Sequence, residues 1–195
     1  LRGSTKLGED RMPYDIMLIL NRFFFEMSEA LKTTKGHYAN FNGDGLMALY
    51  GLESGYEAGC REAIAGAVEM QRRMDHLNRT FESEIGRKLR IGVGIHSGDA
   101  IVGSMGPPTT PIVSSIGDNV NVAARLEGLT KEFECGIIIS AVTAEAAGVD
   151  LSHYPRHDAE LRGRDETISI YTLPDDANPM PSSSADPEAE TKKSA

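Results

Sequence analysis

Apolar residues recur at helical spacing in two long stretches of the chain, residues 12–34 and residues 57–85. Pro13 suits the first turn of the first stretch, and Gly36 ends it. We therefore predict two long helices, each with one apolar face. The positions that form these faces are Ile16, Leu20, Phe23, Phe24, Met27 and Leu31 in the first helix, and Ile64, Val68, Met74, Leu77 and Phe81 in the second.

Shorter apolar runs predict strands. Residues 37–50 are predicted to form a hairpin around Asn-Gly and Asp-Gly turns. Apolar residues at every second position of 89–95 predict a strand. "HSGD" is then expected to turn, and "AIVG" (100–103) to return as the partner strand. Residues 110–116 predict one further strand.

The last third of the chain alternates helices and strands. We expect a helix over 117–133, a buried strand over 136–140 followed by a short Ala-rich helix, and a last strand over 166–173 at an edge of the sheet. The interleaving predicts an α+β fold, with a central mixed or antiparallel sheet flanked by helices. From Pro174 onward, Pro, Ser, Asp, Glu and Lys predict a disordered tail or linker. Residues 1–173 are then one domain, and residues 174–195 follow it.

Composition narrows the classes of function. The formal net charge of −9 argues against a general surface for nucleic acid or anionic membranes. Cys60 and Cys135 lack metal-type spacing, and two cysteines favour a reducing compartment over a disulfide scaffold. No Walker A run is present, and "GVGIHSG" (92–98) misses the spacing of both the dinucleotide-binding loop and the serine nucleophile turn. His96 is therefore expected to be a hydrogen-bonding residue at a strand end.

Asp44 lies in "NFNGDGLMALYG" (40–51), and three interpretations of it are open. It could serve only as a turn residue, because Asn-Gly and Asp-Gly favour tight turns. Asn40, Asn42, Asp44 and Gly45 also match the start of a calcium-binding EF-hand loop, but the twelfth position is Gly51 and not the required Glu. In the third interpretation, Asp44 holds a catalytic metal ion.

"SSIGDNVNVAARLEG" (114–128) is the second informative stretch. Asn121 and Arg125 are four residues apart and share one face of the predicted helix. Such a pair near a helix N-terminus can bind a ribose and a phosphate. The alternative is a helix cap at Asp118 with a solvated arginine.

Taken together, these motifs resemble the catalytic domain of class III nucleotide cyclases, the bacterial-type adenylyl and guanylyl cyclases. The resemblance covers roughly residues 1–173 and rests on five stretches in family order. These are "LRGSTKLGEDRMPYDIMLILNRFF", "FNGDGLMALYG", "RIGVGIHSGDAIVGSMG", "IGDNVNVAARLEG" and "ELRGRDETISIYTL". The resemblance implies the family's ferredoxin-like-based fold.

The resemblance also implies a site with two metal ions, Mg²⁺ or Mn²⁺, held by two aspartates. Asp44 matches the second aspartate. The first is expected immediately before Leu1, so that the opening strand begins upstream of this sequence. The Leu1 carbonyl would also touch metal, and Gly3, Ser4 and Thr5 would surround phosphate.

By the same resemblance, the reaction is attack of the ribose 3′-oxygen on the α-phosphate, with release of pyrophosphate. Asn121 matches the residue that orients the ribose, and Arg125 matches the arginine that stabilises charge on the α-phosphate. Arg162 falls where the family commonly has a lysine for the terminal phosphates, and an arginine can serve there as well.

Two positions depart from the family's pattern for reading the base. Asn40 stands where adenylyl cyclases usually have Lys, and Ser114 stands where they have Asp or Thr. Both side chains can donate and accept hydrogen bonds, so the pair could bind adenine without strongly rejecting guanine. We expect ATP as the substrate, with a guanylyl or relaxed-specificity cyclase as the alternative.

The family implies a homodimer whose active sites are shared between the two chains. An upstream sensor or membrane domain, a cytoplasmic location and no nucleic-acid partner are also expected. Two rivals remain. Diguanylate cyclases carry G-G-[DE]-E-F at the equivalent hairpin, which "NGDGL" lacks. A catalytically dead cyclase-homology module for dimerisation or regulation is the other.

Overall fold

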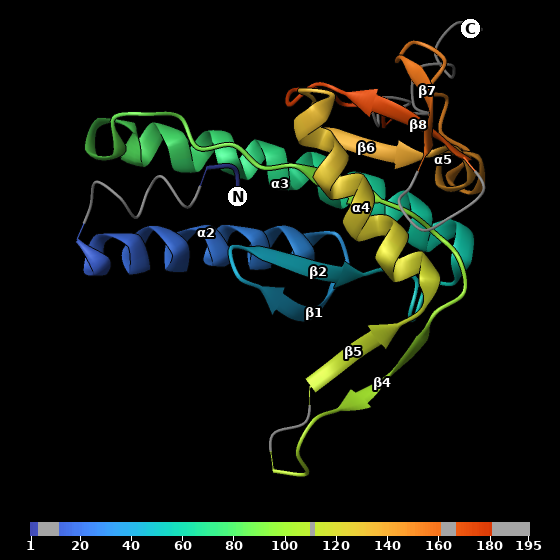
Figure 1. Ribbon diagram of the computed structural model, residues 1–195, viewed down its shortest axis with the longest axis horizontal. Helices are drawn as coiled ribbons and strands as arrows, with labels where there is room; N and C mark the ends of the chain where they lie inside the picture. Colours follow the sequence, from blue (N-terminus) through green and yellow to red (C-terminus); the bar gives the residue numbers. More distant parts are fainter. Residues whose placement is uncertain (4–11, 110–111, 161–166, 181–195) are drawn as a thin grey trace, which may run out of the picture.

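Two long helices, α2 (Pro13–Thr33) and α3 (Tyr56–Ile85), pack against each other along one side of the protein (Figure 1). The structure is a computed structural model that describes residues 1–3, 12–109, 112–160 and 167–180. Phe23, Met27 and Leu31 of α2 are buried against Met74 and Leu77 of α3 in one apolar cluster. The apolar stripes that predict the two helices are thus the surfaces that hold them together.

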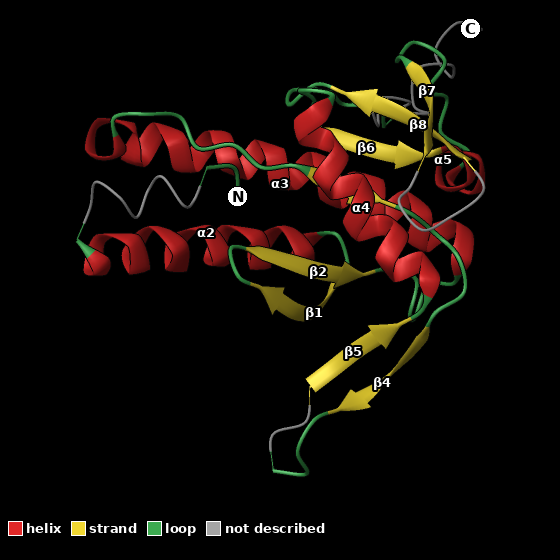
Figure 2. Cartoon of the chain, viewed as in Figure 1, coloured by secondary structure: helices red, strands yellow, loops and turns green. Residues whose placement is uncertain are grey.

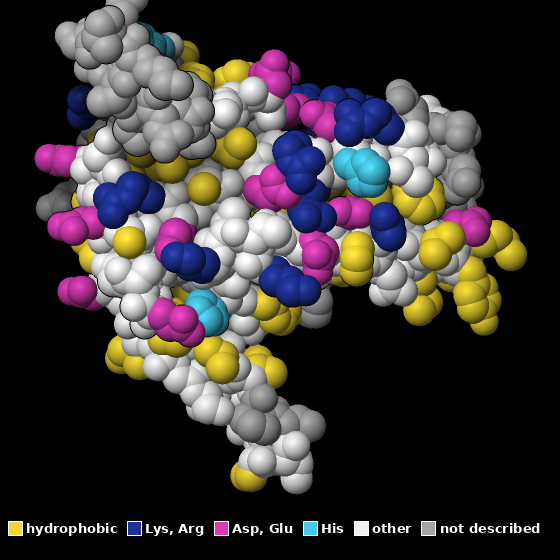
Figure 3. Space-filling model, turned by 180° about the vertical axis from the view of Figure 1, so that it is seen from behind, with side chains coloured by type: hydrophobic (Ala, Val, Ile, Leu, Met, Phe, Trp, Pro, Cys, Tyr) yellow, Lys and Arg dark blue, Asp and Glu magenta, His cyan; other side chains and the backbone are white. Residues whose placement is uncertain are grey.

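A buried ion pair also joins the two helices. Glu26 of α2 is almost wholly buried, and its two carboxylate oxygens lie 3.0 Å from Arg22 Nη2 and from Arg73 Nη1 of α3. The surface seen from behind carries a band of interspersed acidic and basic side chains (Figure 3). Charges of both signs therefore alternate on this face.

The main sheet has four strands in the order β3-β6-β8-β7, namely β3 (Val93–Ile95), β6 (Ile137–Ser140), β8 (Thr167–Leu173) and β7 (Arg156–Glu160). β3 pairs parallel to β6, and the other pairs are antiparallel. Helices cover both faces: α4 (Asp118–Glu132) packs on one, and α3 with α5 (Ala141–Ala147) on the other (Figure 2). The predicted α+β fold with a mixed sheet flanked by helices is confirmed.

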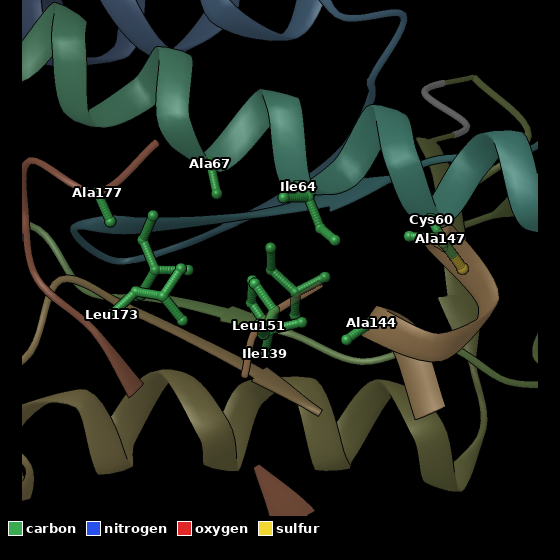
Figure 4. Close-up of a cluster of buried hydrophobic side chains, with 11 residues drawn as sticks. Cys60, Ile64, Ala67, Ile139, Ala144, Ala147, Leu151, Leu173 and Ala177 are labelled. Atoms are coloured by element: carbon green, nitrogen blue, oxygen red, sulfur yellow. The ribbon is translucent and has the colours of Figure 1, made fainter. Parts of the chain in front are cut away.

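β6 explains how the sheet is held between the helices. Its residues alternate between the two faces, as side chains in any strand do. Ile139 packs among α3 and α5 side chains (Figure 4), and so does Ile137, whereas Ile138 packs against α4. Burial on both sides accounts for the continuous apolar run in "GIIIS".

Two hairpins lie outside this sheet. The first consists of β1 (His37–Asn42) and β2 (Gly45–Leu49), and the second of β4 (Ile101–Met105) and β5 (Ile112–Ile116). The second hairpin, here called the β4–β5 arm, projects away from the helices and the main sheet (Figure 1). β1 lies in contact with β5.

The structure corrects the pairing expected for three predicted strands. AIVG does not return to the strand before it, because β4 pairs with β5 and β3 pairs with β6. The last strand is not at an edge, since β7, which was not predicted, pairs along its outer side. Of the strand expected over 89–95, only Val93–Ile95 forms sheet pairs. Leu89 is buried, but its backbone bonds to a side chain: its N–H donates to Asn78 Oδ1, and its carbonyl accepts from Asn78 Nδ2, both at 2.8 Å.

Pro174 was expected to begin the tail, yet the residues that follow it to Met180 contact the domain. Asp175 forms two hydrogen bonds with Arg90, at 2.8 and 3.1 Å, and Ala177 is buried in the cluster under α3. The packed part of the chain therefore extends past Leu173. The rest of the predicted tail, residues 181–195, lies outside the described residues.

Candidate active site

Asp44 stands at the tip of the β1–β2 hairpin, as predicted. Asn42 pairs with Gly45, and Gly43 between them has a φ of +65°, a conformation that glycine adopts without strain. The Asp44 side chain is 39% exposed. The amino group of Leu1 donates to the Asp44 carbonyl at 3.1 Å and lies 3.7 Å from the carboxylate oxygen Oδ2. The structure thus brings together the two residues predicted to bind metal.

Arg2 holds the first residues in this position. Its backbone N–H donates to the Arg90 carbonyl at 2.8 Å, and its Nη2 donates to the carbonyls of Thr130, at 3.0 Å, and Cys135. Sequence reasoning missed this role, although Arg2 lies within the first motif. Gly3 has a φ of +69°, and its carbonyl accepts a bond from Arg87 at 3.0 Å. Ser4 and Thr5 lie outside the described residues.

Asn121 and Arg125 lie one turn apart on α4, as predicted. Val122 and Leu126, which flank them in sequence, are fully buried and fix the helix on the sheet. Asn121 is exposed and Arg125 is half-buried. Arg125 Nη1 is buried and has no hydrogen-bond partner among the described residues. Because a buried guanidinium N–H without an acceptor is costly, this nitrogen is suited to receive an anion.

Asn40 and Ser114 come from the two hairpins that touch each other. Asn40 is on β1, directly after a register irregularity, and Ser114 is on β5 opposite Gly103. Both are half-buried. Contact between β1 and β5 places the two predicted base-reading residues on adjoining elements. The remaining predicted substrate residue, Arg162, lies outside the described residues.

Of the described candidate residues, Asn121 is exposed, whereas Asn40, Asp44, Ser114 and Arg125 are half-buried. One surface hollow is lined by Thr33, Val68 and Met180, among others, and a second by Leu18, Phe25 and Phe81. Neither of these two hollows includes a predicted site residue. Asp44 and Asn121 each face solvent on one side in a single chain.

The Asp44 carboxylate and the Leu1 carbonyl, the two groups predicted to bind metal, are oxygen donors of the kind that suit a hard divalent cation. A carboxylate and a backbone carbonyl are ligands that Mg²⁺ and Mn²⁺ prefer. Asp44 and Leu1 provide only part of a ligand set, and the described residues contain no group of three or more His, Cys, Asp or Glu that could hold a metal ion. The calcium interpretation fails, because strands and not helices flank the Asp44 turn.

The two cysteines and His96 are other residue types that can act in catalysis, but their surroundings do not favour such a role here. Cys60 and Cys135 are free and buried, and burial raises the pKa of both thiols, which keeps them protonated. His96, expected to be a strand-end hydrogen-bonding residue, lies 2.9 Å from Ser140 Oγ and 3.0 Å from Asn119 Oδ1. The alternative interpretation expected the cap of this helix at Asp118. The cap is instead Gly117, and Asp118 lies in the first turn of α4.

The chain is similar in sequence to known proteins. The sequence model of the adenylate and guanylate cyclase catalytic domain matches residues 1–174. An adenylate cyclase of Anabaena cylindrica is 32% identical over 180 residues, which cover 89% of this chain but 35% of that protein. The chain thus spans about a third of the length of this relative.

Solved structures of cyclases have a similar fold. The guanylyl cyclase Cya2 superimposes with a TM-score of 0.79 at 28% identity, over 89% of this chain and 87% of that one. The adenylyl cyclase CyaB from P. aeruginosa superimposes with a TM-score of 0.77 at 26% identity, over 92% of each chain. The predicted cyclase fold is confirmed. One of these two structures is a guanylyl cyclase and the other an adenylyl cyclase, and both are about equally similar to this chain.

Proposed function

The chain belongs to the adenylate and guanylate cyclase catalytic domain family, and we propose that it converts ATP to 3′,5′-cyclic AMP and pyrophosphate. The observation that carries this proposal is the position of Asp44, at a hairpin tip within 3.7 Å of the Leu1 nitrogen. In a longer chain, a residue bonded to that nitrogen would stand beside Asp44. An aspartate there would complete the pair of carboxylates that the family uses.

The chain's residues divide into two groups. Asp44 and the Leu1 carbonyl would provide part of the ligands for two Mg²⁺ or Mn²⁺ ions, which when bound would lower the pKa of the ribose 3′-hydroxyl and neutralise the triphosphate. Gly3, Ser4 and Thr5 would bind the phosphates. On α4, Asn121 would hold the ribose with its 3′-oxygen in line with the α-phosphate, and Arg125 would stabilise charge that develops there. Arg162 would bind the terminal phosphates.

The reaction can be tested directly. A protein that includes the residue before Leu1, incubated with ATP and Mg²⁺ or Mn²⁺, should release cyclic AMP and pyrophosphate in equal amounts. Linear AMP or ADP as the product would point to hydrolysis and contradict the proposal. Absence of any product under these conditions would favour a dead cyclase-homology module.

We predict loose choice of base, because the Asn40 amide and the Ser114 hydroxyl each can donate or accept. The wild-type enzyme should favour ATP over GTP by less than about a thousandfold in kcat/KM, the range that strict hydrogen-bonding sites exceed. Asn40→Lys should raise this ratio, since an ammonium donates only and suits adenine N1. Kinetics with both nucleotides measure the ratio.

Asn178→Lys is the matched control, since it adds the same charge at an exposed asparagine outside the site. It should leave the ratio unchanged. A wild-type preference above a thousandfold, or an Asn40→Lys variant that shifts towards GTP, would show that these two residues do not read the base.

We also propose a homodimer that assembles through the β4–β5 arm. The arm exposes six large apolar side chains, each between 38% and 77% accessible: Ile101, Val102, Met105, Ile112, Val113 and Ile116. Figure 3 shows hydrophobic side chains where the arm leaves the body. An exposed apolar surface of this kind is typical of a protein–protein interface.

Ile112→Glu should therefore dissociate the dimer and remove activity together. Burying an unpaired carboxylate in an interface costs several kcal/mol, so the dimer Kd should rise by about a hundredfold or more. Sedimentation analysis measures the Kd. Val142→Glu, which places the same charge on an exposed apolar residue of α5, is the control and should remain dimeric and active. Full activity of monomeric Ile112→Glu would contradict the proposal.

We place the domain in the cytoplasm, within a longer protein that carries a sensor or a membrane domain. Two free cysteines suit a reducing compartment, where ATP is also available. Among the described residues, no helix combines the length and apolar character needed to cross a membrane.

A further inference from the structure

The β4–β5 arm joins the rest of the protein through two short connections. The chain leaves the main sheet at Ile95, the end of β3, and it returns through Gly117 into α4 (Figure 1). An extended hairpin on two such connections could tilt easily. Contacts near its base, together with the contact between β5 and β1, therefore set its direction.

Asn119, in the first turn of α4, bonds to two residues of the outgoing connection, His96 and Asp99. Its Nδ2 donates to the Asp99 carbonyl at 2.9 Å, and its Oδ1 lies 3.0 Å from His96 Nε2. Since Nδ2 faces a carbonyl, Oδ1 is the acceptor and His96 Nε2 carries the proton. Gly98 leaves room for this amide, because a Cβ there would lie 2.3 Å from Asn119 Nδ2. We call these four residues, His96, Gly98, Asp99 and Asn119, the Asn119 junction.

The core holds His96 in turn. Its Nδ1 lies 2.9 Å from the hydroxyl of Ser140, which lies 2.8 Å from the hydroxyl of Thr143. Ser140 and Thr143 are fully buried. Thr143 donates to Ser97 at 3.0 Å, on the same outgoing connection. The junction is thus the end of a hydrogen-bond chain anchored in the interior, and its geometry is specified on several sides.

We propose that Asn119, held by His96 and bonded to the Asp99 carbonyl, is a positioning residue that fixes the β4–β5 arm relative to helix α4. The effect on activity rests on the cyclase function proposed above. The arm carries Ser114, and α4 carries Asn121 and Arg125. A base held by Ser114 and a ribose held by Asn121 belong to one nucleotide. The angle between arm and helix therefore sets whether the two contacts can form together.

A distance measurement tests the proposal without relying on activity. Nitroxide labels are placed at Ser104→Cys on the arm and at Lys131→Cys near the end of α4, two exposed positions. The native cysteines are buried. Pulsed electron paramagnetic resonance on labelled protein diluted with unlabelled protein measures the distance within one chain. A single narrow distribution is expected with native Asn119, and a shifted or broader one with Asn119→Ala.

Two further variants separate positioning from general destabilisation. Asn119→Asp keeps an acceptor for His96 but loses the donor to Asp99, so it should also broaden the distribution if it folds. His96→Ala should broaden it less, because the bond between Asn119 and Asp99 remains. Circular dichroism confirms that each variant is folded. An unchanged distribution in folded Asn119→Ala and folded Asn119→Asp would overturn the proposal.

Kinetics provide the link to function, with Asn121→Ala as the control on the same helix. Asn119→Ala should lower kcat/KM by up to about a hundredfold, the loss that a misplacement near 1 Å can cause, while the metal concentration for half-maximal activity stays unchanged. Asn121→Ala should lose activity but keep the narrow distribution. If the distribution broadens as expected but the wild type makes no cyclic nucleotide, the junction stands and the proposed function fails.

Discussion

Asp44→Ala should abolish cyclase activity while leaving the domain folded. Loss of a carboxylate that holds divalent metal removes several kcal/mol of stabilisation from the transition state, which corresponds to about a thousandfold or more in kcat. The fold should survive because Asp44 is at a hairpin tip and is 39% exposed, so little apolar packing depends on it. Cyclic AMP formation and thermal unfolding are measured on the same preparation.

The control is Asp176→Ala, which removes an exposed carboxylate outside the site and should keep full activity. Metal binding supplies a second readout: Asp44→Ala should bind Mn²⁺ more weakly than wild type in a titration without nucleotide. Wild-type activity in folded Asp44→Ala would disprove the metal assignment. A variant that loses activity only because it unfolds would be seen in the thermal scan, and Asp44→Asn, which keeps the shape of the side chain, then takes its place.

The helices and the first hairpin were predictable because their signals are local. The stripe over 12–34 and the stripe over 57–85 correspond to α2 and α3 within one or two residues. Asn-Gly and Asp-Gly specify the turn of the β1–β2 hairpin through the backbone freedom of Gly43. Neighbours along the chain are enough to determine such elements.

Strand pairing was less predictable because it depends on distant parts of the chain. A turn signal in "HSGD" suggested a hairpin with β4, but β3 finds its parallel partner in β6 beyond the arm and α4. β7 has no alternating apolar pattern, since only Ala159 of its five residues is buried. Without β7, the strand over 167–173 looked like an edge.

The candidate site shows the same division. The hairpin places Asp44 at its tip as predicted, and α4 places Asn121 and Arg125 one turn apart, while their chemical roles stay predictions. The support from Arg2 was missed because it consists of bonds to carbonyls of Thr130 and Cys135, which leave no side-chain signature in the sequence. The docking of Asp175 on Arg90 was missed because the composition after Pro174 is that of a linker.

The open position of the candidate residues leads to the remaining prediction. In one chain, Asp44 lies at the β1–β2 tip, whereas Asn121 and Arg125 lie on α4, and both groups are accessible. In the homodimer that we propose, the metal-binding groups and the Asn/Arg helix of one site come from different subunits. Each chain here carries both groups, so a two-fold homodimer would contain two complete sites.

Asp44→Ala and Arg125→Ala should therefore each be inactive alone and regain activity when mixed. Removing Arg125 should cost about a hundredfold to a thousandfold in kcat, as for other groups that stabilise developing charge. In a mixed dimer, one site combines both defects and the other has none, so each heterodimer should approach half of the wild-type dimer's activity.

Differently tagged variants, purified as heterodimers in sequence over two affinity columns, allow the activity per heterodimer to be measured. The control is a mixture of Asp44→Ala with Asp44→Asn, which leaves a defect in every site and should stay inactive. Zero activity in verified Asp44→Ala/Arg125→Ala heterodimers would mean that the two groups act within one chain, because only then does every site keep a defect.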